Sequence, residues 1–260
     1  MTLRSLSQNI QEIETNKQVL CGIIKGIGFR PGSNSGKSAG FYSRKPGSTP
    51  HQIETDNNQW TKLHQYAKFV YLRISDFSKL AANEDKSLME AAKLLNFSQL
   101  EWTSANPKEE FKSFTNVIVT QNGFFNKPHQ DLNYLNSWTY DIFSFVSKKD
   151  FHPLASVLTP SGLGFNFNEL KMKIDFPKDP GIMEIILKTS TMLHQAANPP
   201  EDIINHDEIT HVGFSFQINH KLFTLGNKFL KMTPTKINSK VNGSFVRNMQ
   251  DQKRTKKYQL

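Results

Sequence analysis

The sequence feature that most constrains the fold is an apolar strand that leads into a His-x-Asp pair. Residues 117–119, all Val or Ile, are typical of a buried strand, and the Asn-Gly pair at 122–123 is typical of a turn. Two phenylalanines follow, and then His129 and Asp131. Side chains at positions i and i+2 of a strand point to the same face. The pattern therefore predicts a β-rich domain in which His129 and Asp131 reach one shared ligand.

A lone histidine, His194, follows Asp131 by 63 residues. Two histidines and one carboxylate form an iron site that holds Fe(II) on one face and leaves positions open for a co-substrate and O₂. The separation is the one expected if the His129 pair lies early in a β-barrel core and His194 near its end. Each residue alone is more often an ordinary core or surface side chain, so the prediction depends on all three. A catalytic zinc ion takes the same ligand types, and the sequence leaves that alternative open.

The bulk composition is that of an intracellular protein without a membrane span. The chain has 260 residues, which is enough for one sizeable domain with extensions and a substantial core. Cys21 is the single cysteine, so an intrachain disulfide is excluded and a reducing compartment is favoured. The first fifteen residues are polar, unlike a secretory signal, and no run approaches the roughly 20 apolar residues that cross a bilayer.

The positive charge is concentrated at the C-terminal end. The net charge is +9, and residues 228–260 carry nine basic side chains against Asp251 alone, which leaves only +1 for residues 1–227. A basic tail adds salt-dependent affinity for the phosphates of nucleic acid, and residues 253–257 are typical of a nuclear-import patch. The alternative is a solvated, disordered terminus. We expect a polar segment at 1–20, one domain at 21–227 and a basic, flexible tail at 228–260.

Hydrophobic periodicity predicts an α+β protein in which strands make up most of the second half. The expected elements are a polar helical segment at 1–20, a short strand at 21–24, a loop at 31–50, helices at 59–77 and 86–95, and strands at 115–120, 137–147, 171–176, 181–188 and 211–219. This strand count fits a double-stranded β-helix, that is, a jelly-roll or cupin-like core, with N-terminal helices.

The segment from Gly32 to Ser38 invites comparison with a phosphate-binding loop. That motif needs four residues between its glycines before Lys-Ser, and this chain has three between Gly32 and Gly36. The residues that follow do not favour the helix whose N-terminus would bind the phosphate. The sequence therefore argues against a nucleoside-triphosphate site.

Several segments together resemble the Tet-like 2-oxoglutarate/Fe(II) oxygenase domain found in many fungal proteins. The similar segments are GFFNKPHQD at 123–131, IDF at 174–176 through GIMEIIL at 181–187 to His194, THVGFSFQIN at 210–219, and the opening loop from 28 to 40. The resemblance covers residues from about 20 to 225. The combination is fairly specific, whereas each motif alone is not.

The resemblance implies a double-stranded β-helix and oxidation of a nucleobase methyl group in DNA or RNA with Fe(II), O₂ and 2-oxoglutarate. The better-known Tet and J-binding-protein enzymes act on 5-methylcytosine and thymine, respectively. By motif position, His129, Asp131 and His194 would be the iron ligands. Aromatic side chains near the motif would stack on a flipped base or pack in the core; they are Phe124, Phe125, Tyr134, Trp138 and Tyr140.

This chain departs from the family pattern at the expected co-substrate anchor. His211 stands where members usually have Arg, in a Thr-Arg-x-Gly-x-Ser segment that ends here at Ser215. Arg binds a carboxylate bidentately and stays charged, whereas His offers one ring N–H and loses its charge near neutral pH. One outcome is weaker co-substrate binding that improves at low pH, and another is an inactive copy. The third is a substitute base, for which the candidates are Arg30, Lys37, Arg44 and Lys221.

Three functions remain open at this point. The first is a dioxygenase that hydroxylates a methylated nucleobase, and the second is a catalytically degenerate module that keeps the fold and binds nucleic acid. The third is a dioxygenase of protein or small molecules, which the small net charge of residues 1–227 favours.

Overall fold

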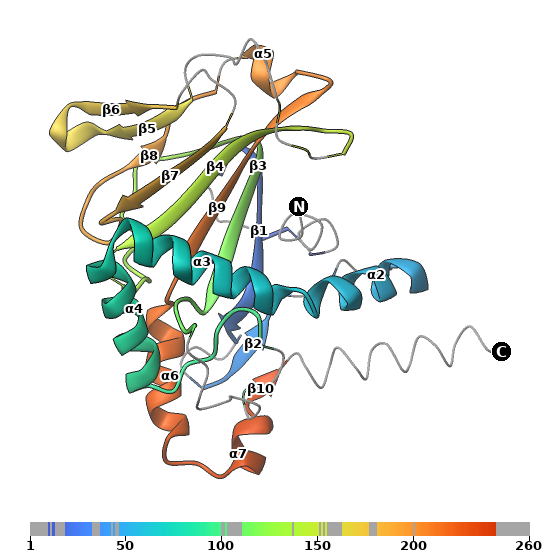
Figure 1. Ribbon diagram of the computed structural model, residues 1–260, viewed down its shortest axis with the longest axis vertical. Helices are drawn as coiled ribbons and strands as arrows, with labels where there is room; N and C mark the ends of the chain where they lie inside the picture. The colour runs from blue at the N-terminus through green and yellow to red at the C-terminus, as the bar shows by residue number, and fades with distance from the viewer. Residues whose placement is uncertain are drawn as a thin grey trace.

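The computed structural model shows two mainly antiparallel sheets with helices packed against the larger one (Figure 1). The residues that it describes are 10, 12, 13, 19–32, 37–42, 44, 47–99, 102, 111–136, 138–150, 152, 154, 163–176, 181–199 and 201–242. In this part of the chain no helix is both long and apolar enough to cross a membrane.

The larger sheet has seven strands in the order β10-β2-β1-β3-β9-β4-β7. Their bounds are β1 (Val19–Pro31), β2 (Ala39–Phe41), β3 (Asn116–Asn126), β4 (Thr139–Ser147), β7 (Ile182–Leu187), β9 (Ile209–Gln217) and β10 (Val241–Asn242). All neighbours are antiparallel except the β2–β10 pair. The late strand β9 lies between the earlier strands β3 and β4, as strands do in a jelly roll rather than in a simple meander.

The smaller sheet consists of β6 (Met172–Asp175), β5 (Gly164–Phe167) and β8 (Gln195–Ala196), with a short 3-10 helix at Asn168–Leu170. Side chains of both sheets line one pocket, so the smaller sheet covers part of the larger one. The predicted double-stranded β-helix is therefore confirmed.

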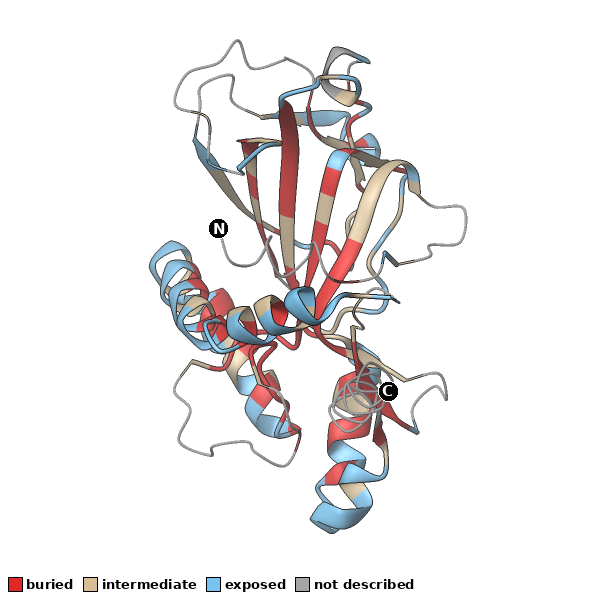
Figure 2. Ribbon diagram, turned by 90° about the vertical axis from the view of Figure 1, so that its right-hand side faces the viewer, coloured by how far each residue is buried: buried red, intermediate tan, exposed pale blue. Residues whose placement is uncertain are grey.

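Side-chain alternation gives the larger sheet two different faces. On β3, Val117 and Val119 are buried in the main hydrophobic core, whereas Ile118 and Thr120 line the pocket. This is the period-two pattern of a strand that is covered on both sides. Figure 2 shows the result, because the strands of the sheet are largely buried whereas the helices bury one side only.

The helices are α2 (Pro50–Trp60), α3 (Leu63–Phe77), α4 (Lys79–Ala91), α5 (Glu201–Ile204), α6 (His220–Phe229) and α7 (Pro234–Asn238). Helices α2, α3, α4 and α6 bury residues in the main core, whereas α5 contacts β3 and β9. On α3, apolar residues at steps of three and four are buried, as an amphipathic helix requires. Arg73 of α3 donates hydrogen bonds to the carboxylate of Glu184 on β7, and Tyr140 on β4 donates to the same carboxylate. This contact fastens α3 to the sheet.

Helix boundaries differ from the prediction where polar side chains act as caps. The predicted helix at 59–77 is two helices, α2 and α3, and Thr49 forms a capping box that starts α2. The predicted helix at 86–95 begins earlier, as α4, because the Ser78 side chain accepts a hydrogen bond from the Ala81 N–H. The strand predictions between 115 and 219 correspond to β3, β4, β6, β7 and β9.

The N-terminal expectations need correction. Where the structure describes residues 1–20 they are extended, not helical: Ile10 and Glu12 form β-bridges, and β1 begins at Val19 because it pairs along β3. Strands β1 and β2 therefore precede the helices, and β2 lies inside the predicted loop at 31–50. After Ser38 the chain continues as β2, so the helix that a phosphate-binding loop requires is not there.

The start of the predicted tail at residue 228 is also wrong. Helix α6 continues to Phe229, α7 follows, and β10 pairs with β2. Phe229 and Val241 are buried in the main core, and this apolar burial keeps the basic segment up to residue 242 in the fold. The remainder of the predicted tail, 243–260, lies outside the described residues.

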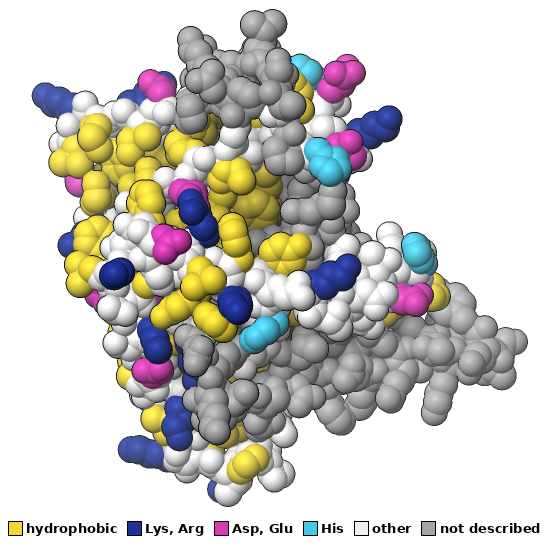
Figure 3. All heavy atoms as spheres, viewed as in Figure 1, with side chains coloured by type: hydrophobic (Ala, Val, Ile, Leu, Met, Phe, Trp, Pro, Cys, Tyr) yellow, Lys and Arg dark blue, Asp and Glu magenta, His cyan; other side chains and the backbone are white. Residues whose placement is uncertain are grey.

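The surface seen in Figure 3 has mixed charge, with Lys and Arg scattered among Asp and Glu. Four large apolar side chains of α3 and α4 are exposed, namely Phe69, Leu72, Phe77 and Leu80. Apolar side chains gather on this face around the two helices, and no continuous basic patch is visible on it.

Candidate active site

The three predicted metal ligands lie together at one end of the pocket. His129 and Asp131 follow the end of β3, and their segment runs beside the one that carries His194. The His129 N–H donates to the His194 carbonyl (2.9 Å) and the His194 N–H donates to the His129 carbonyl (3.0 Å). The Asp131 N–H donates to the Thr189 carbonyl (2.9 Å). Backbone pairing between two distant segments therefore sets the ligand positions.

The two imidazoles are oriented by their own backbone. Nδ1 of His129 is 2.9 Å from the Lys127 carbonyl, and Nδ1 of His194 is 2.9 Å from the Met192 carbonyl. A carbonyl only accepts, so each Nδ1 carries the proton and each Nε2 presents a lone pair. This outer hydrogen bond is the arrangement that fixes a metal-binding histidine.

The ligand atoms converge on one point. Nε2 of His129 is 3.6 Å from Oδ1 of Asp131, and Nε2 of His194 is 3.7 Å from Oδ2. One ligand atom from each of the three residues lies within 4.8 Å of the others. Ligands at roughly 2.1 Å from a metal and at right angles to each other are about 3 Å apart, so small side-chain shifts suffice to bind one ion.

The electrostatics of this cluster are those of a cation site. Burial raises the pKa of Asp131, which the two histidines oppose, and burial lowers the pKa of His194. Two imidazole Nε2 atoms and the Asp131 carboxyl group face one another, with the Asn126 amide nitrogen 3.4 Å from Nε2 of His129, and a bound cation compensates such a set of acceptors. The residues present fit a divalent iron ion.

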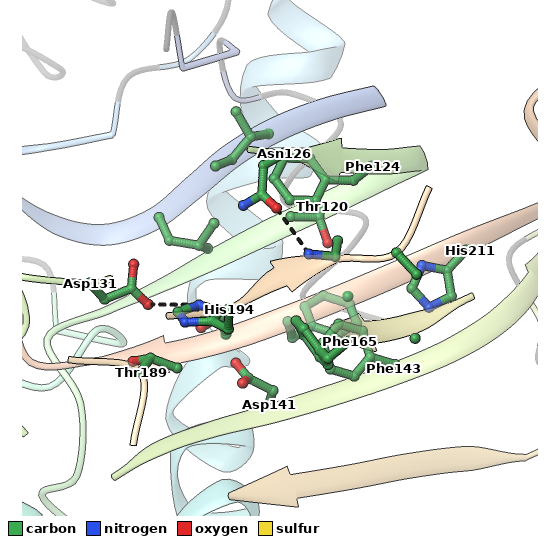
Figure 4. Close-up of a pocket in the computed structure, with 18 of the residues that line it drawn as sticks. Thr120, Phe124, Asn126, Asp131, Asp141, Phe143, Phe165, Thr189, His194 and His211 are labelled. Carbon is green, nitrogen blue, oxygen red and sulfur yellow. Dashed lines mark hydrogen bonds and ion pairs between the residues drawn. The ribbon is translucent and has the colours of Figure 1, made fainter. Parts of the chain in front are cut away.

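The pocket extends from this metal end toward a far end lined by aromatic rings (Figure 4). Asp131, His194 and Thr189 lie at the metal end, and His211 lies at the opposite end with Phe143 and Phe165 between. The pocket volume is about 120 Å³. Along β9, the alternate residues His211, Gly213, Ser215 and Gln217 all line the pocket.

A match to a protein family decides what kind of site this is. The Tet-like 2OG-Fe(II) oxygenase superfamily matches residues 2–199, roughly three quarters of the chain. The chain belongs to this superfamily. Its cofactors are accordingly Fe(II) and 2-oxoglutarate, and the convergent His-Asp-His set is the candidate for the iron ligands. The match includes β1 to β8 and ends before β9, so His211 and Ser215 lie outside it.

Other comparisons add little to this assignment. Among solved structures, a prolyl-4-hydroxylase from Pseudomonas putida is similar with a TM-score of 0.33 and 12% sequence identity. The similarity covers 84% of this chain and 81% of the hydroxylase chain. No curated protein matches the sequence significantly.

Asp141 is a pocket residue of this Tet-like oxygenase that sequence reasoning missed. It lies on β4 and is buried, and burial raises the pKa of its carboxyl group from 3.8 to about 7. A hydrogen bond with Ser215 opposes that rise, and the Ser215 hydroxyl also accepts from Gln217 (3.1 Å). The signal was present, because Asp141 is the one charged residue of a largely buried strand and lies on the same face as Phe143.

His211 is enclosed by aromatic rings. Its imidazole stacks on Phe143 (5.6 Å between centroids, 7° between planes) and on Phe176 (5.1 Å, 28°), and Phe145 meets it edge-on (5.4 Å). Burial lowers the pKa of His211 to about 4, so the ring is neutral at physiological pH. Its Nε2 is buried and has no hydrogen-bond partner among the described residues.

The substitute bases considered from the sequence do not line the pocket. Arg30 donates from Nε to the Phe41 carbonyl (3.0 Å), next to β2. Arg44 forms an ion pair with buried Asp56 (2.9 Å), and the side chains of Lys37 and Lys221 are exposed. Among the predicted site residues, the structure therefore brings together the three ligands, His211 and Ser215, but not Arg30.

The five aromatic residues near the motif separate into two groups. Phe124 and Tyr134 line the pocket. Tyr140 is fully buried on the core face, and Trp138 packs against the core beneath the Lys188 ammonium group, 4.5 Å from its ring centroid. Phe125 is half-buried and is not part of the pocket lining.

Proposed function

We propose that this protein is an Fe(II)- and 2-oxoglutarate-dependent dioxygenase that hydroxylates a methylated nucleobase, such as 5-methylcytosine, in nucleic acid. The observation that carries the proposal is the convergence of His129, Asp131 and His194 at one end of an aromatic-lined pocket. Membership of the Tet-like superfamily supports the reaction type and the two cofactors.

When bound, iron and 2-oxoglutarate supply the oxidation of an unactivated C–H bond by O₂. The protein contributes position and exclusion of water. The carbonyls of Lys127 and Met192 keep the Nδ1 proton on each histidine, so both Nε2 atoms remain available to the metal. Thr189 donates a hydrogen bond to the Asp131 carboxylate and keeps it turned toward the histidines.

Apolar rings make the rest of the pocket a dry environment. Phe143, Phe165 and Phe176 pack against one another with centroids 4.8 to 5.8 Å apart. This apolar lining excludes water from the space in which the organic substrate would lie beside a bound iron. The same rings present faces on which a flat heterocycle stacks.

A base inside a duplex would have to leave the stack to enter this pocket. Phe124 and Tyr134, which belong to the pocket lining near the ligand segment, are the aromatic residues that we expect to contact it. Tyr140 is excluded from that role because its side chain is fully buried in the core. This protein would therefore read a flipped or single-stranded base by stacking.

We also propose that the basic residues near the C-terminus add affinity for nucleic acid and direct nuclear import, as the run at 253–257 indicates. These residues lie outside the described part of the chain. Fusing residues 243–260 to a reporter tests import, and an even distribution of the reporter between nucleus and cytoplasm would reject it.

The test of the main proposal is oxidation of defined oligonucleotides. The Fe(II)-loaded protein is incubated with O₂, 2-oxoglutarate and DNA or RNA strands, single or paired, that carry 5-methylcytosine. We expect nucleoside mass spectrometry to show a product heavier by one oxygen atom. The His194→Ala variant should form none, and His51→Ala, which removes an exposed histidine on α2, should match the wild type.

The outcomes separate the alternatives. Succinate release without an oxidised base would mean that the enzyme acts on another substrate, such as a protein or a small molecule. Iron binding with neither succinate nor oxidised base would favour a degenerate copy. Oxidation of the base by His194→Ala at the wild-type rate would reject the assigned site.

A further inference from the structure

The described residues at the far end of the pocket offer no cationic side chain to pair with a dicarboxylate. The described lining residues include no Lys and no Arg. Apart from the two histidine ligands and His211, the titratable groups there are Asp131, Asp141 and Tyr134. None of these groups is a cation at neutral pH. Among the described residues, the second carboxylate of 2-oxoglutarate would therefore have no charged partner in this pocket.

Within the described part of the chain, the distal carboxylate lacks a cationic partner in either direction in which the co-substrate could extend from the iron. Toward the far end it meets Phe143 and His211 (Figure 4), together with Phe176, which stacks on His211. Along β9 it meets the hydroxyl of Ser215 and the amide of Gln217, which are neutral and already hydrogen-bonded to each other. Burying a charged group without a partner is strongly unfavourable, whereas burying an apolar group against aromatic rings is favourable.

His211 does not supply the missing charge. Its buried ring packs against both Phe143 and Phe176, which also contact each other, with Phe145 on its edge, and a protonated imidazole would lose its hydration there. Together with Phe143 and Phe176, the neutral imidazole provides a flat aromatic surface, and its Nε2 is the one polar atom there without a hydrogen-bond partner among the described residues. Such a lining suits an apolar or aromatic end of a ligand.

We propose that this pocket prefers a 2-oxo acid whose far end is uncharged and apolar, and that it binds such an acid more tightly than 2-oxoglutarate. The inference rests on the proposed function, since it concerns the co-substrate that joins the iron. 2-Oxoglutarate remains a co-substrate, but one bound without a cation at its distal carboxylate.

The test compares two co-substrates of similar length. Under anaerobic conditions, the full-length Fe(II)-loaded protein is titrated with 2-oxoglutarate and with 2-oxohexanoate, which replaces the distal carboxylate by a hydrocarbon end. Binding is followed by the visible charge-transfer band and by calorimetry, neither of which requires turnover. We expect 2-oxohexanoate to bind about tenfold more tightly, because an unpaired buried carboxylate costs at least that much.

Two variants at one position sharpen the result. His211→Arg places a guanidinium at the far end and should shift the affinity ratio at least about tenfold toward 2-oxoglutarate. His211→Phe keeps the end aromatic and should retain the wild-type preference. If His211→Arg does not fold, the His211→Phe comparison and the wild-type ratio still decide the proposal.

Arg30→Gln is the matched control, since Arg30 lies outside the pocket and should leave both affinities unchanged. Tighter binding of 2-oxoglutarate by the wild type would overturn the inference and leave the proposed function intact. Loss of 2-oxoglutarate binding alone in Arg30→Gln would also overturn it, because Arg30 would then be the anchor. No band with either acid on iron-loaded protein would reject both the inference and the proposed function.

Discussion

The two ends of the pocket are built by different means. At the metal end, His129, Asp131 and His194 lie on irregular segments that backbone hydrogen bonds hold side by side. At the far end, His211 and Phe143 lie on paired strands of the larger sheet, and their alternation places them in the pocket. The ability of the metal end to bind an ion depends on the residue types of its ligands. The charge and polarity of the far end depend instead on the side chains packed around His211. Sequence reasoning is accordingly stronger at the first than at the second.

The largest expected effect comes from breaking the metal end. Asp131→Ala removes the only carboxylate from the ligand set and should weaken Fe(II) binding by more than about 100-fold, since even changes to the outer partners of metal ligands cost 10- to 100-fold. The measurement is bound iron after anaerobic dialysis, together with the rise in Tm on adding Fe(II). His51→Ala is the control, and an unchanged iron content in Asp131→Ala would remove Asp131 from the site.

Asp141 connects the two ends and should give the next largest effect. Burial raises its pKa from 3.8 to about 7. In the metal-free protein the folded state keeps this proton while the unfolded state loses it, so stability falls as pH rises from about 4 to about 7. The fall is roughly 1 kcal/mol for each pH unit, several kcal/mol in all.

Asp141→Asn removes that titration. We expect the variant to gain stability relative to the wild type as the pH rises toward about 7, with no further gain above it. Urea unfolding of the metal-free proteins at a series of pH values measures the difference. A constant difference between the two proteins across the series would mean that Asp141 titrates normally in the folded state.

What the sequence could predict follows the same division. The spacing of His129, Asp131 and His194 predicted three residues that the structure brings together, because a candidate metal site is recognised by residue type. The positions of β3, β4 and β9 followed from runs of apolar residues. The surroundings of His211 and Asp141 could not be predicted from the sequence, because burial by residues distant in the sequence shifts both pKa values. Phe176, for example, packs on the His211 ring from another segment. The fold of residues 228–242 was missed because the buried Phe229 and Val241 are isolated among basic residues.

His211→Phe tests the far end of the pocket, because His211 should change protein stability with pH in the direction opposite to Asp141. Burial lowers the pKa of His211 from 6.5 to about 4. As pH falls below about 6.5 the unfolded state takes up a proton that the folded state refuses, so wild-type stability falls between about pH 6.5 and 4. The slope is again roughly 1 kcal/mol for each pH unit, but over a narrower window than for Asp141.

The phenylalanine variant has no proton to bind, so its stability relative to the wild type should rise as the pH falls through this window. In the wild type, His211 and Asp141 change the free energy of unfolding with pH in opposite directions, and the two effects largely cancel between about pH 4 and 6.5. Each variant removes one of these effects and so reveals the other. Equal pH profiles for His211→Phe and the wild type would show that the imidazole titrates in the folded protein as it does in the unfolded chain.

The smallest effect is expected from Thr189→Val, which tests whether the metal end also depends on its surroundings. The Thr189 hydroxyl donates to Asp131 and lies 2.5 Å from the Thr139 hydroxyl, whereas the Thr189 carbonyl accepts from the Asp131 N–H. Valine keeps the backbone contact and the side-chain shape but removes the donor. We expect Fe(II) affinity to fall about tenfold with little change in Tm, because the carboxylate then rotates more freely. Thr191→Val, an exposed threonine on the same segment, is the control. Equal iron affinity in both variants would mean that the backbone pairing of the two segments suffices to orient the ligands.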